Sequence, residues 1–140
     1  MKRLGKAEAI SLRTKAVSGE ADGTELINDE AYIPEWTQRN YTTIPVGSPF
    51  KYGEQVYTLT QQHDATSQPD WKPGIAYSLW DIKHTQDPVF AKPYIPPQGA
   101  WGLYATGSCM IWSDGHVYIS TMENNSWTPE SYPQGWKLLL

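Results

Sequence analysis

The chain has 140 residues, with 11 Lys and Arg against 15 Asp and Glu and a net charge of −4. This length allows one ordinary domain or two very small ones. No basic cluster follows Lys2 and Arg3, so the electrostatic footprint of a nucleic-acid-binding protein is missing. No stretch approaches the ~20 consecutive apolar residues that cross a membrane. We therefore expect neither a nucleic-acid partner nor a membrane span.

Cys109 is the single cysteine, so no disulfide can form within the chain. Small modules exported to an oxidising compartment are often stapled by disulfides. The N-terminal stretch is basic but has no apolar run of the kind that a signal peptide requires. Both features favour assembly in a reducing cytoplasm, without a signal peptide.

The aromatic content is unusual, with 7 Trp and 9 Tyr against only 2 Phe. A core alone would use Phe and aliphatic residues more freely. Trp and Tyr combine a flat apolar face with a polar group, which suits half-exposed recognition surfaces. The composition thus favours a surface that binds a ligand.

Residues 4–17 form the one convincing helical stretch, because good helix formers fill it and neither Gly nor Pro follows Gly5. Its apolar stripe is thin, and a helix this short is marginal alone in water. Ser18-Gly19 ends it, and residues 24–31 can add a short turn of helix before Pro34. We interpret residues 1–31 as a helical arm that serves docking or oligomerisation.

From Pro34 onward, prolines and glycines recur every few residues, and the segments between them alternate apolar and polar side chains. Residues 50–52, 55–59 and 116–120 follow this pattern, with tight turns at residues 52–54 and 113–115. Such alternation is typical of short β-strands joined in hairpins. The sequence predicts a mainly β fold.

The region after the arm contains an internal repeat. The first copy spans residues 36–80 and the second residues 101–136, and in both a Trp-x-Pro motif starts nine residues before the closing Trp. These motifs start at Trp71 and Trp127. We expect two small three-stranded antiparallel β modules in tandem behind the short N-terminal helical arm. The predicted parts are the arm at 1–31, module 1 at 32–84, a Pro-rich linker at 85–100 and module 2 at 101–140.

The first copy contains, in order, Trp36, Tyr41, Gly47, Tyr52-Gly53, Val56-Tyr57, His63, Trp71-x-Pro73 and Trp80. This order and spacing resemble the small chitin- and cellulose-binding modules of bacterial chitinases (carbohydrate-binding module families 5 and 12). The second copy matches more loosely, since its Tyr-Gly turn is replaced and its loop before Trp127 is shorter. The resemblance implies that the Trp of Trp-x-Pro is exposed for stacking, whereas the opening and closing Trp belong to the core.

The stretches EAYIPEW, DPVFAKPYIPP and ENNSWTPESYPQGWK are similar in sequence to a group of phage tail proteins from bacteria of the Firmicutes type. That resemblance implies a virion tail component, assembled in the bacterial cytoplasm, that touches the host wall. Its expected partners are a polysaccharide or cell-surface glycan, other phage tail proteins and further copies of itself in a homo-oligomer.

An aromatic face held outward by a rigid loop stacks on the C–H face of a sugar ring. Trp71 and Trp127 fit this role, because Pro73 and Pro129 stiffen their loops; core packing is the alternative for both. His63 either contacts the sugar or is a solvated loop residue. Asp70 and Asn125 are either turn residues or partners of sugar hydroxyls. The candidate ligand-binding residues are Trp71, Pro73, His63, Asp70, Trp127, Pro129 and Asn125.

No catalytic arrangement emerges from the sequence. Glycosidases need two carboxylates about 5–9.5 Å apart across the scissile bond, and the acids here lie in loops without a paired motif. His63, His84 and His116 lack metal-like spacing with Cys or acids. We expect no enzyme, no metal and no cofactor.

The pattern favours a non-catalytic protein that binds carbohydrate, chitin-like or a cell-wall polysaccharide, as part of a phage tail. The alternative is a structural tail or baseplate adaptor whose modules have lost sugar binding. A targeting module appended to a larger enzyme is a third reading. Burial of both Trp-x-Pro indoles would favour the adaptor.

Overall fold

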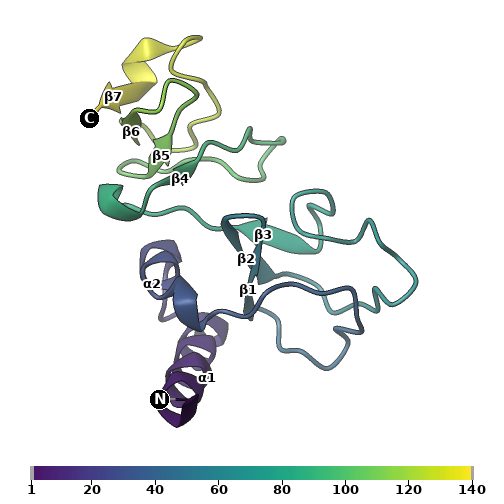
Figure 1. Ribbon diagram of the computed structural model, residues 1–140. Helices are drawn as coiled ribbons and strands as arrows, with labels where there is room; N and C mark the ends of the chain where they lie inside the picture. The colour runs from purple at the N-terminus through teal and green to yellow at the C-terminus, as the bar shows by residue number, and fades with distance from the viewer. Residues whose placement is uncertain (1, 140) are drawn as a thin grey trace. The chain divides into compact units, whose positions relative to one another are not determined.

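The computed structural model describes residues 2–139, with side chains from residue 6 onward. The chain divides into two compact units, Met1–Lys83 and His84–Leu140. Each unit is built around one small β-sheet (Figure 1). The predicted fold class, mainly β with two small sheet modules behind a short N-terminal helical arm, is confirmed.

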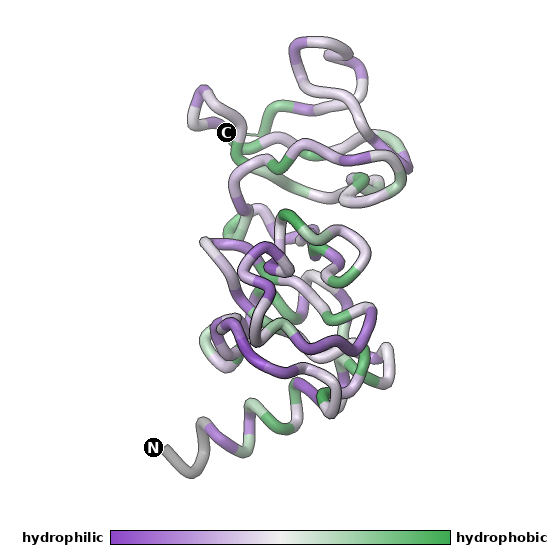
Figure 2. The backbone as a smooth tube through the Cα atoms, turned by 90° about the vertical axis from the view of Figure 1, so that its right-hand side faces the viewer, coloured by the Kyte–Doolittle hydropathy of each residue, from purple (hydrophilic) through white to green (hydrophobic). Residues whose placement is uncertain are grey.

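The arm consists of α1 (Lys2–Ser18), α2 (Gly23–Asn28) and the 3-10 turn η1 (Glu30–Tyr32). The carboxylate of Asp22 caps α2 by accepting a hydrogen bond from the N–H of Glu25 at 3.0 Å, which satisfies a donor that the helix itself leaves open. Hydrophilic and hydrophobic residues alternate along α1 (Figure 2). No helix in the described part of the chain is both long and apolar enough to cross a membrane.

The arm packs into the core of the first unit. Leu12 of α1 and Leu26 and Ile27 of α2 are buried in one cluster with Ile33 and Val56. Val56 belongs to the sheet, so the helices and the sheet share a core. Burial of an apolar face supplies the stability that a short helix lacks alone.

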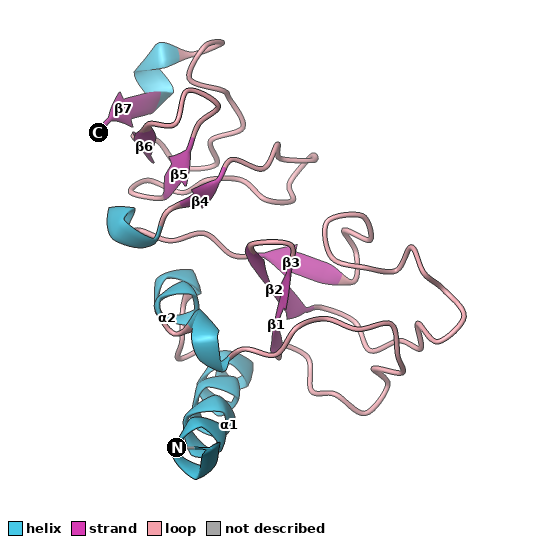
Figure 3. Ribbon diagram, viewed as in Figure 1, coloured by secondary structure: helices cyan, strands magenta, loops and turns pink. Residues whose placement is uncertain are grey.

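The first sheet contains β1 (Pro49–Tyr52), β2 (Gln55–Leu59) and β3 (Trp80–Ile82), all antiparallel in the order β1-β2-β3. Tyr52 pairs with Gln55 across a two-residue turn, as the Tyr-Gly-Glu sequence predicts. Residues 60–79 contain neither helix nor strand and form a long excursion between β2 and β3 (Figure 3).

The second sheet contains β4 (Lys92–Pro93), β5 (Cys109–Ile111), β6 (Val117–Ser120) and β7 (Trp136–Leu138) in that order. Short 3-10 turns, η2 (Pro88–Phe90) and η3 (Pro133–Gly135), precede the two outer strands. The strands β5, β6 and β7 form the three antiparallel strands that the sequence predicted. A fourth strand, β4, adds to them in parallel with β5.

The two sheets repeat the same hydrogen bonds. Gly47 N–H donates to the carbonyl of Leu59 and Gly107 N–H to that of Ser120, at 2.7 and 2.8 Å. Leu59 and Ser120 in turn pair with the closing tryptophans: the register pairs are Leu59↔Trp80 and Ser120↔Trp136. The predicted correspondence of the closing tryptophans is therefore confirmed.

The structure gives a different counterpart for the opening residue of the repeat. Trp36 N–H donates to the carbonyl of Lys51 in β1, and Tyr94 N–H donates to the carbonyl of Ile111 in β5, at equivalent positions of these two strands. Tyr94, not Trp101, thus corresponds to Trp36. Residues 85–100, predicted as a linker, contain β4 and lie in the second unit. Their backbone groups pair with β5, a partner that proline-rich composition alone does not reveal.

Candidate ligand-binding site

Two loops at equivalent positions each present one exposed indole. We call residues 71–80 and 127–136 the platform loops. Trp71 is 38% exposed and Trp127 is 49% exposed. The tryptophans that close the loops are buried, Trp80 at 0% and Trp136 at 6% exposure. Stacking and core packing are both compatible with the sequence around Trp71 and Trp127, and in the structure neither indole is buried.

Each platform loop is closed by the same hydrogen bond. The indole Nε1–H of Trp80 donates to the backbone carbonyl of Trp71 at 3.1 Å, and that of Trp136 donates to the carbonyl of Trp127 at 2.8 Å. A buried side chain therefore holds the backbone directly beneath each exposed indole. Such preorganisation reduces the conformational entropy that a binding surface loses when a ligand docks.

The first platform loop is shaped by a buried proline and a glycine. The side chain of Pro73 is fully buried. Gly74 has φ +89°, and a Cβ there would lie 3.3 Å from the phenol oxygen of Tyr57. Backbone in this left-handed region favours glycine. Pro73, predicted to line the site, thus fixes the loop from inside.

His63 lies beneath this loop and is 8% exposed. Its ring contacts Trp71 edge-on, with the centroids 6.0 Å apart. Nδ1 is 2.8 Å from the carbonyl oxygen of Gln61, and because a carbonyl only accepts, we assign the ring proton to Nδ1. Nε2 is then an acceptor, and it is buried without a hydrogen-bond partner among the described residues. A buried polar atom of this kind is rare in folded proteins.

A groove of about 780 Å³ runs along the first platform loop. Three of the predicted residues line it together: His63, Asp70 and Trp71. Ile75 and Tyr77 also line it and are exposed, although the sequence did not single them out. The only signal was their position, four and six residues after the Trp of a Trp-x-Pro motif.

The second platform loop is held by Asn125, which is fully buried. Its Nδ2 donates to Ser120 Oγ at 3.1 Å and to the carbonyl of Gly135 at 2.8 Å, and its Oδ1 accepts from Trp127 N–H at 3.0 Å. All the contacts of the amide are thus inside the module. Asn125 was predicted either as a hydrogen-bonding turn residue or as a partner of sugar hydroxyls, and these bonds give it the first role, which positions Trp127.

The rest of the second loop is tied by hydroxyl groups. Ser131 N–H donates to Thr128 Oγ1 at 3.0 Å, and Thr128 N–H donates to Ser131 Oγ at 3.0 Å. Pro129 lies half-buried between them. Tyr132 is exposed, and its ring centroid is 5.9 Å from that of Trp127. The exposed aromatic surface therefore extends past the single indole.

His63 and Asn125 occupy equivalent positions in the two units. The carbonyl of His63 accepts from Tyr41 N–H, and the carbonyl of Asn125 accepts from Tyr104 N–H. Tyr41 and Tyr104 are both buried core residues. The first unit therefore has an unused acceptor where the second unit has a fully bonded amide, so the two sites are not chemically identical.

Hydrogen bonds and burial shift the pKa values of several groups near the loops. The side-chain and backbone donors of Thr66 hold the pKa of Asp64 below its usual value. In the second unit, hydrogen bonds from His116 N–H and the Tyr118 hydroxyl lower the pKa of Asp114. Burial raises the pKa of Tyr57 to about 12. At neutral pH these acids are ionised and Tyr57 is neutral.

A comparison with protein-family models and with curated protein sequences found no match for this chain. The chemistry of the site must therefore be read from its own side chains. Within the described residues, no three His, Cys, Asp or Glu side chains gather to hold a metal ion. The platform loops offer flat apolar faces with polar neighbours, an arrangement that suits stacking and hydrogen bonding.

Proposed function

We propose that this protein binds a polysaccharide without cleaving it, through Trp71 and Trp127. The observation that carries the proposal is the repetition: two units expose an indole at the same place and anchor it with the same indole-to-carbonyl hydrogen bond. Trp suits a half-exposed recognition surface, because it combines a flat apolar face with a polar group. Core packing does not account for either indole.

The polar surroundings of Trp71 support a sugar as the ligand. A ring stacked on an indole presents hydroxyl groups at its edge, and these need hydrogen-bond partners. The carboxylate of Asp70 is exposed beside Trp71 and can accept from such hydroxyls. His63, whose ring contacts Trp71, has at Nε2 an acceptor with no partner in the described structure.

We further propose that the protein works in a phage tail and touches the host cell surface there, as a homo-oligomer among other tail proteins. This part of the proposal is supported only by the sequence resemblance to phage tail proteins. The alternative, a structural adaptor that has lost sugar binding, is separated from the proposal by the experiment below.

Pull-down on insoluble chitin, cellulose and bacterial cell walls tests the proposal. Compared with the wild type, Trp71→Ala should weaken retention by about fivefold or more, since one stacked partner contributes about 1–3 kcal/mol by analogy with bases stacked on aromatic side chains. The melting temperature should change little, because the indole is exposed. Phe90→Ala is the matched control, since Phe90 is 43% exposed and lies outside both platform loops.

The double variant Trp71→Ala/Trp127→Ala decides between the two functions. If it binds as the wild type does, or if the wild type binds no glycan, the adaptor is the better description. If the double variant binds no more weakly than Trp71→Ala alone, Trp127 does not contribute and the second unit is a structural copy of the first.

A further inference from the structure

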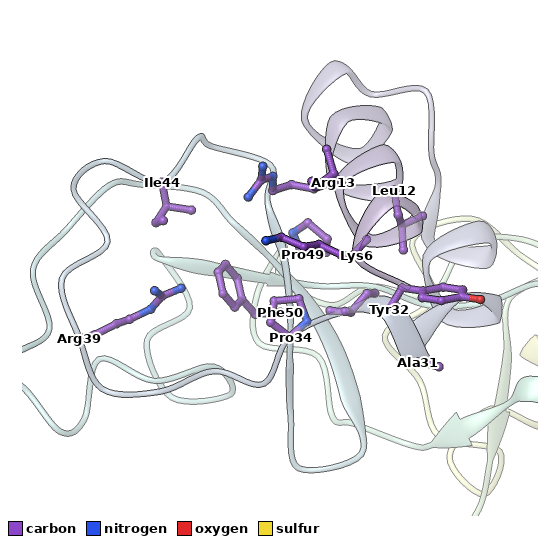
Figure 4. A pocket seen from close by; sticks show the side chains of 13 residues that line it. Lys6, Leu12, Arg13, Ala31, Tyr32, Pro34, Arg39, Ile44, Pro49 and Phe50 are labelled. Carbon is purple, nitrogen blue, oxygen red and sulfur yellow. The ribbon is translucent and has the colours of Figure 1, made fainter. Parts of the chain in front are cut away.

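A second groove, of about 540 Å³, lies in the first unit, away from the platform loop (Figure 4). One side is formed by α1 and by residues 31–34, and the other by Arg39, Ile44 and Phe50. None of the residues that line it belongs to the groove beside Trp71. A ligand here would therefore occupy a different place from the proposed glycan site.

The floor of this groove is apolar. Leu12 and Phe50 are buried at its base, whereas Ile10 is 48% exposed and Tyr32 is 40% exposed at its edge. Water in such a groove contacts hydrocarbon on several sides, so displacing it with an apolar side chain is favourable. The floor alone would accept many apolar groups.

The rim of the groove is basic. Lys6 and Arg13 extend from α1, and the guanidinium of Arg39 points toward Phe50 from the opposite side (Figure 4). None of the 13 residues drawn along the groove is acidic. The three cations form no ion pair with another described residue, whereas Lys15, Lys51 and Lys83 do.

Arg39 is held in place by aromatic rings. Its guanidinium carbon lies 4.9 Å from the centroid of Tyr41 and 5.7 Å from that of Phe50. Cation–π contacts of this kind fix the orientation of the group but leave its hydrogen-bond donors available. In a chain of net charge −4, three cations without an ion pair in the described structure surround one apolar floor and form a local positive field.

We propose that this groove binds a segment of a partner protein in which an apolar side chain is flanked by carboxylates. The apolar side chain would fill the floor against Phe50 and Ile44. The carboxylates would pair with Arg13, Arg39 and Lys6, where guanidinium groups favour bidentate carboxylate contacts. An anionic polysaccharide is the poorer fit, because it has no apolar side chain to cover the floor.

Selection from a random peptide library with the full-length chain as bait tests this inference. The enriched peptides should carry an aliphatic or aromatic residue between acidic residues. A synthetic copy of the best peptide should bind in solution, and replacing its acids with the corresponding amides should weaken the dissociation constant by at least about tenfold. No enrichment, or enrichment of peptides without acids, would overturn the proposal.

Variants of the chain locate the peptide. Arg13→Glu should weaken binding at least about tenfold, since it puts a like charge beside the ligand carboxylates. Arg39→Lys keeps the charge but loses the planar fork, and should have a smaller effect. Lys137→Glu makes the same charge change on the exposed end of β7 in the second unit and should leave binding within about twofold. An equal loss in Lys137→Glu and Arg13→Glu would mean a non-specific effect of net charge and would overturn the site.

Two further outcomes would identify a different occupant. Competition by dextran sulfate as strong as that by the peptide would show an anionic polymer site without apolar selectivity. A wild-type dimer that Arg13→Glu converts to monomer, measured by sedimentation, would show that a second copy of this chain fills the groove. Either result replaces the partner segment proposed here.

Discussion

The indole nitrogen of Trp80 donates a hydrogen bond to the backbone carbonyl of Trp71, 3.1 Å away. Trp80 lies in the core and Trp71 is exposed, so the folded core fixes the position of the exposed indole through this bond. The same relationship joins Trp136 to Trp127 at 2.8 Å. Stability and ligand binding should therefore respond together to changes at the buried partner.

Trp80→Phe removes this bond while keeping an aromatic ring in the core. The carbonyl of Trp71 loses its buried partner, so the free energy of unfolding should fall by about 1–3 kcal/mol, in addition to the cost of the smaller ring. Glycan retention should also fall, although Trp71 itself is unchanged. Urea unfolding and pull-down on the same preparations measure both effects. Full stability with unchanged retention would show that the bond is dispensable.

Asn125→Ala should loosen the second platform loop. It leaves Trp127 N–H and the Gly135 carbonyl without their partner, at about 1–3 kcal/mol for each buried group. Chemical denaturation should show a loss of that order in the second unit. Ser131→Ala is a suitable comparison, because its bonds to Thr128 are exposed and should contribute less. Equal losses in both variants would contradict the central role given to Asn125.

The paired glycines Gly47 and Gly107 allow a matched test of how α1 packs. Both have φ near +90°, so alanine is strained at either place. At Gly47 a Cβ would also lie 3.1 Å from the Cα of Val17, whereas at Gly107 it would meet only the side chain of Gln86. Gly47→Ala should therefore lower the melting temperature of its unit more and reduce helical circular dichroism. A larger effect in Gly107→Ala would mean that α1 can move away from a Cβ at residue 47 with little loss of stability.

Acid should weaken the second unit through Asp114. Its hydrogen bonds hold its pKa in the folded state below the unfolded value of about 3.9. This contribution to stability is present above about pH 4 and is lost as the pH falls through the folded-state pKa. Asp114→Asn can keep an acceptor for Tyr118 and should flatten the decline in melting temperature between pH 5 and pH 2, conditions chosen around that value.

Tyr118→Phe is the comparison for this titration, because it removes one of the two hydrogen bonds that lower the pKa of Asp114 and leaves the one from His116 N–H. It should flatten the decline only in part. The bond between Asp114 and Tyr118 also raises the pKa of the Tyr118 phenol. The same contact is therefore present below about pH 10 and is lost as the pH rises through the raised value.

The sequence predicted the features that depend on local pattern. The nine-residue spacing from Trp71 to Trp80 and from Trp127 to Trp136 identified equivalent loops, because equal spacing of the same residue type is visible without a structure. It could not predict the pairing of Tyr94 with β5. Parallel pairing with a two-residue strand leaves no alternation of side chains to detect.

The roles of His63 and Asn125 also lay beyond the sequence. Both are polar residues in stretches rich in turn formers, where solvent exposure is the ordinary expectation. Asn125 is buried because Gly135 approaches it closely; a Cβ on that glycine would lie 3.2 Å from the amide nitrogen. That approach is a property of tertiary packing. Burial of His63 under Trp71 likewise depends on how a loop of no regular structure returns to the sheet.

The short segments that flank β1 and β5 have a consequence for how the protein can be divided. Residues 34–36 cover the outer edge of β1, and β4 covers that of β5. An uncovered edge strand is a template for aggregation. A fragment starting at Trp101 would leave β5 bare and should precipitate, whereas one starting at His84 would retain its own cover. Each unit thus carries its own edge cover, and a boundary for dividing the chain lies between residues 83 and 84.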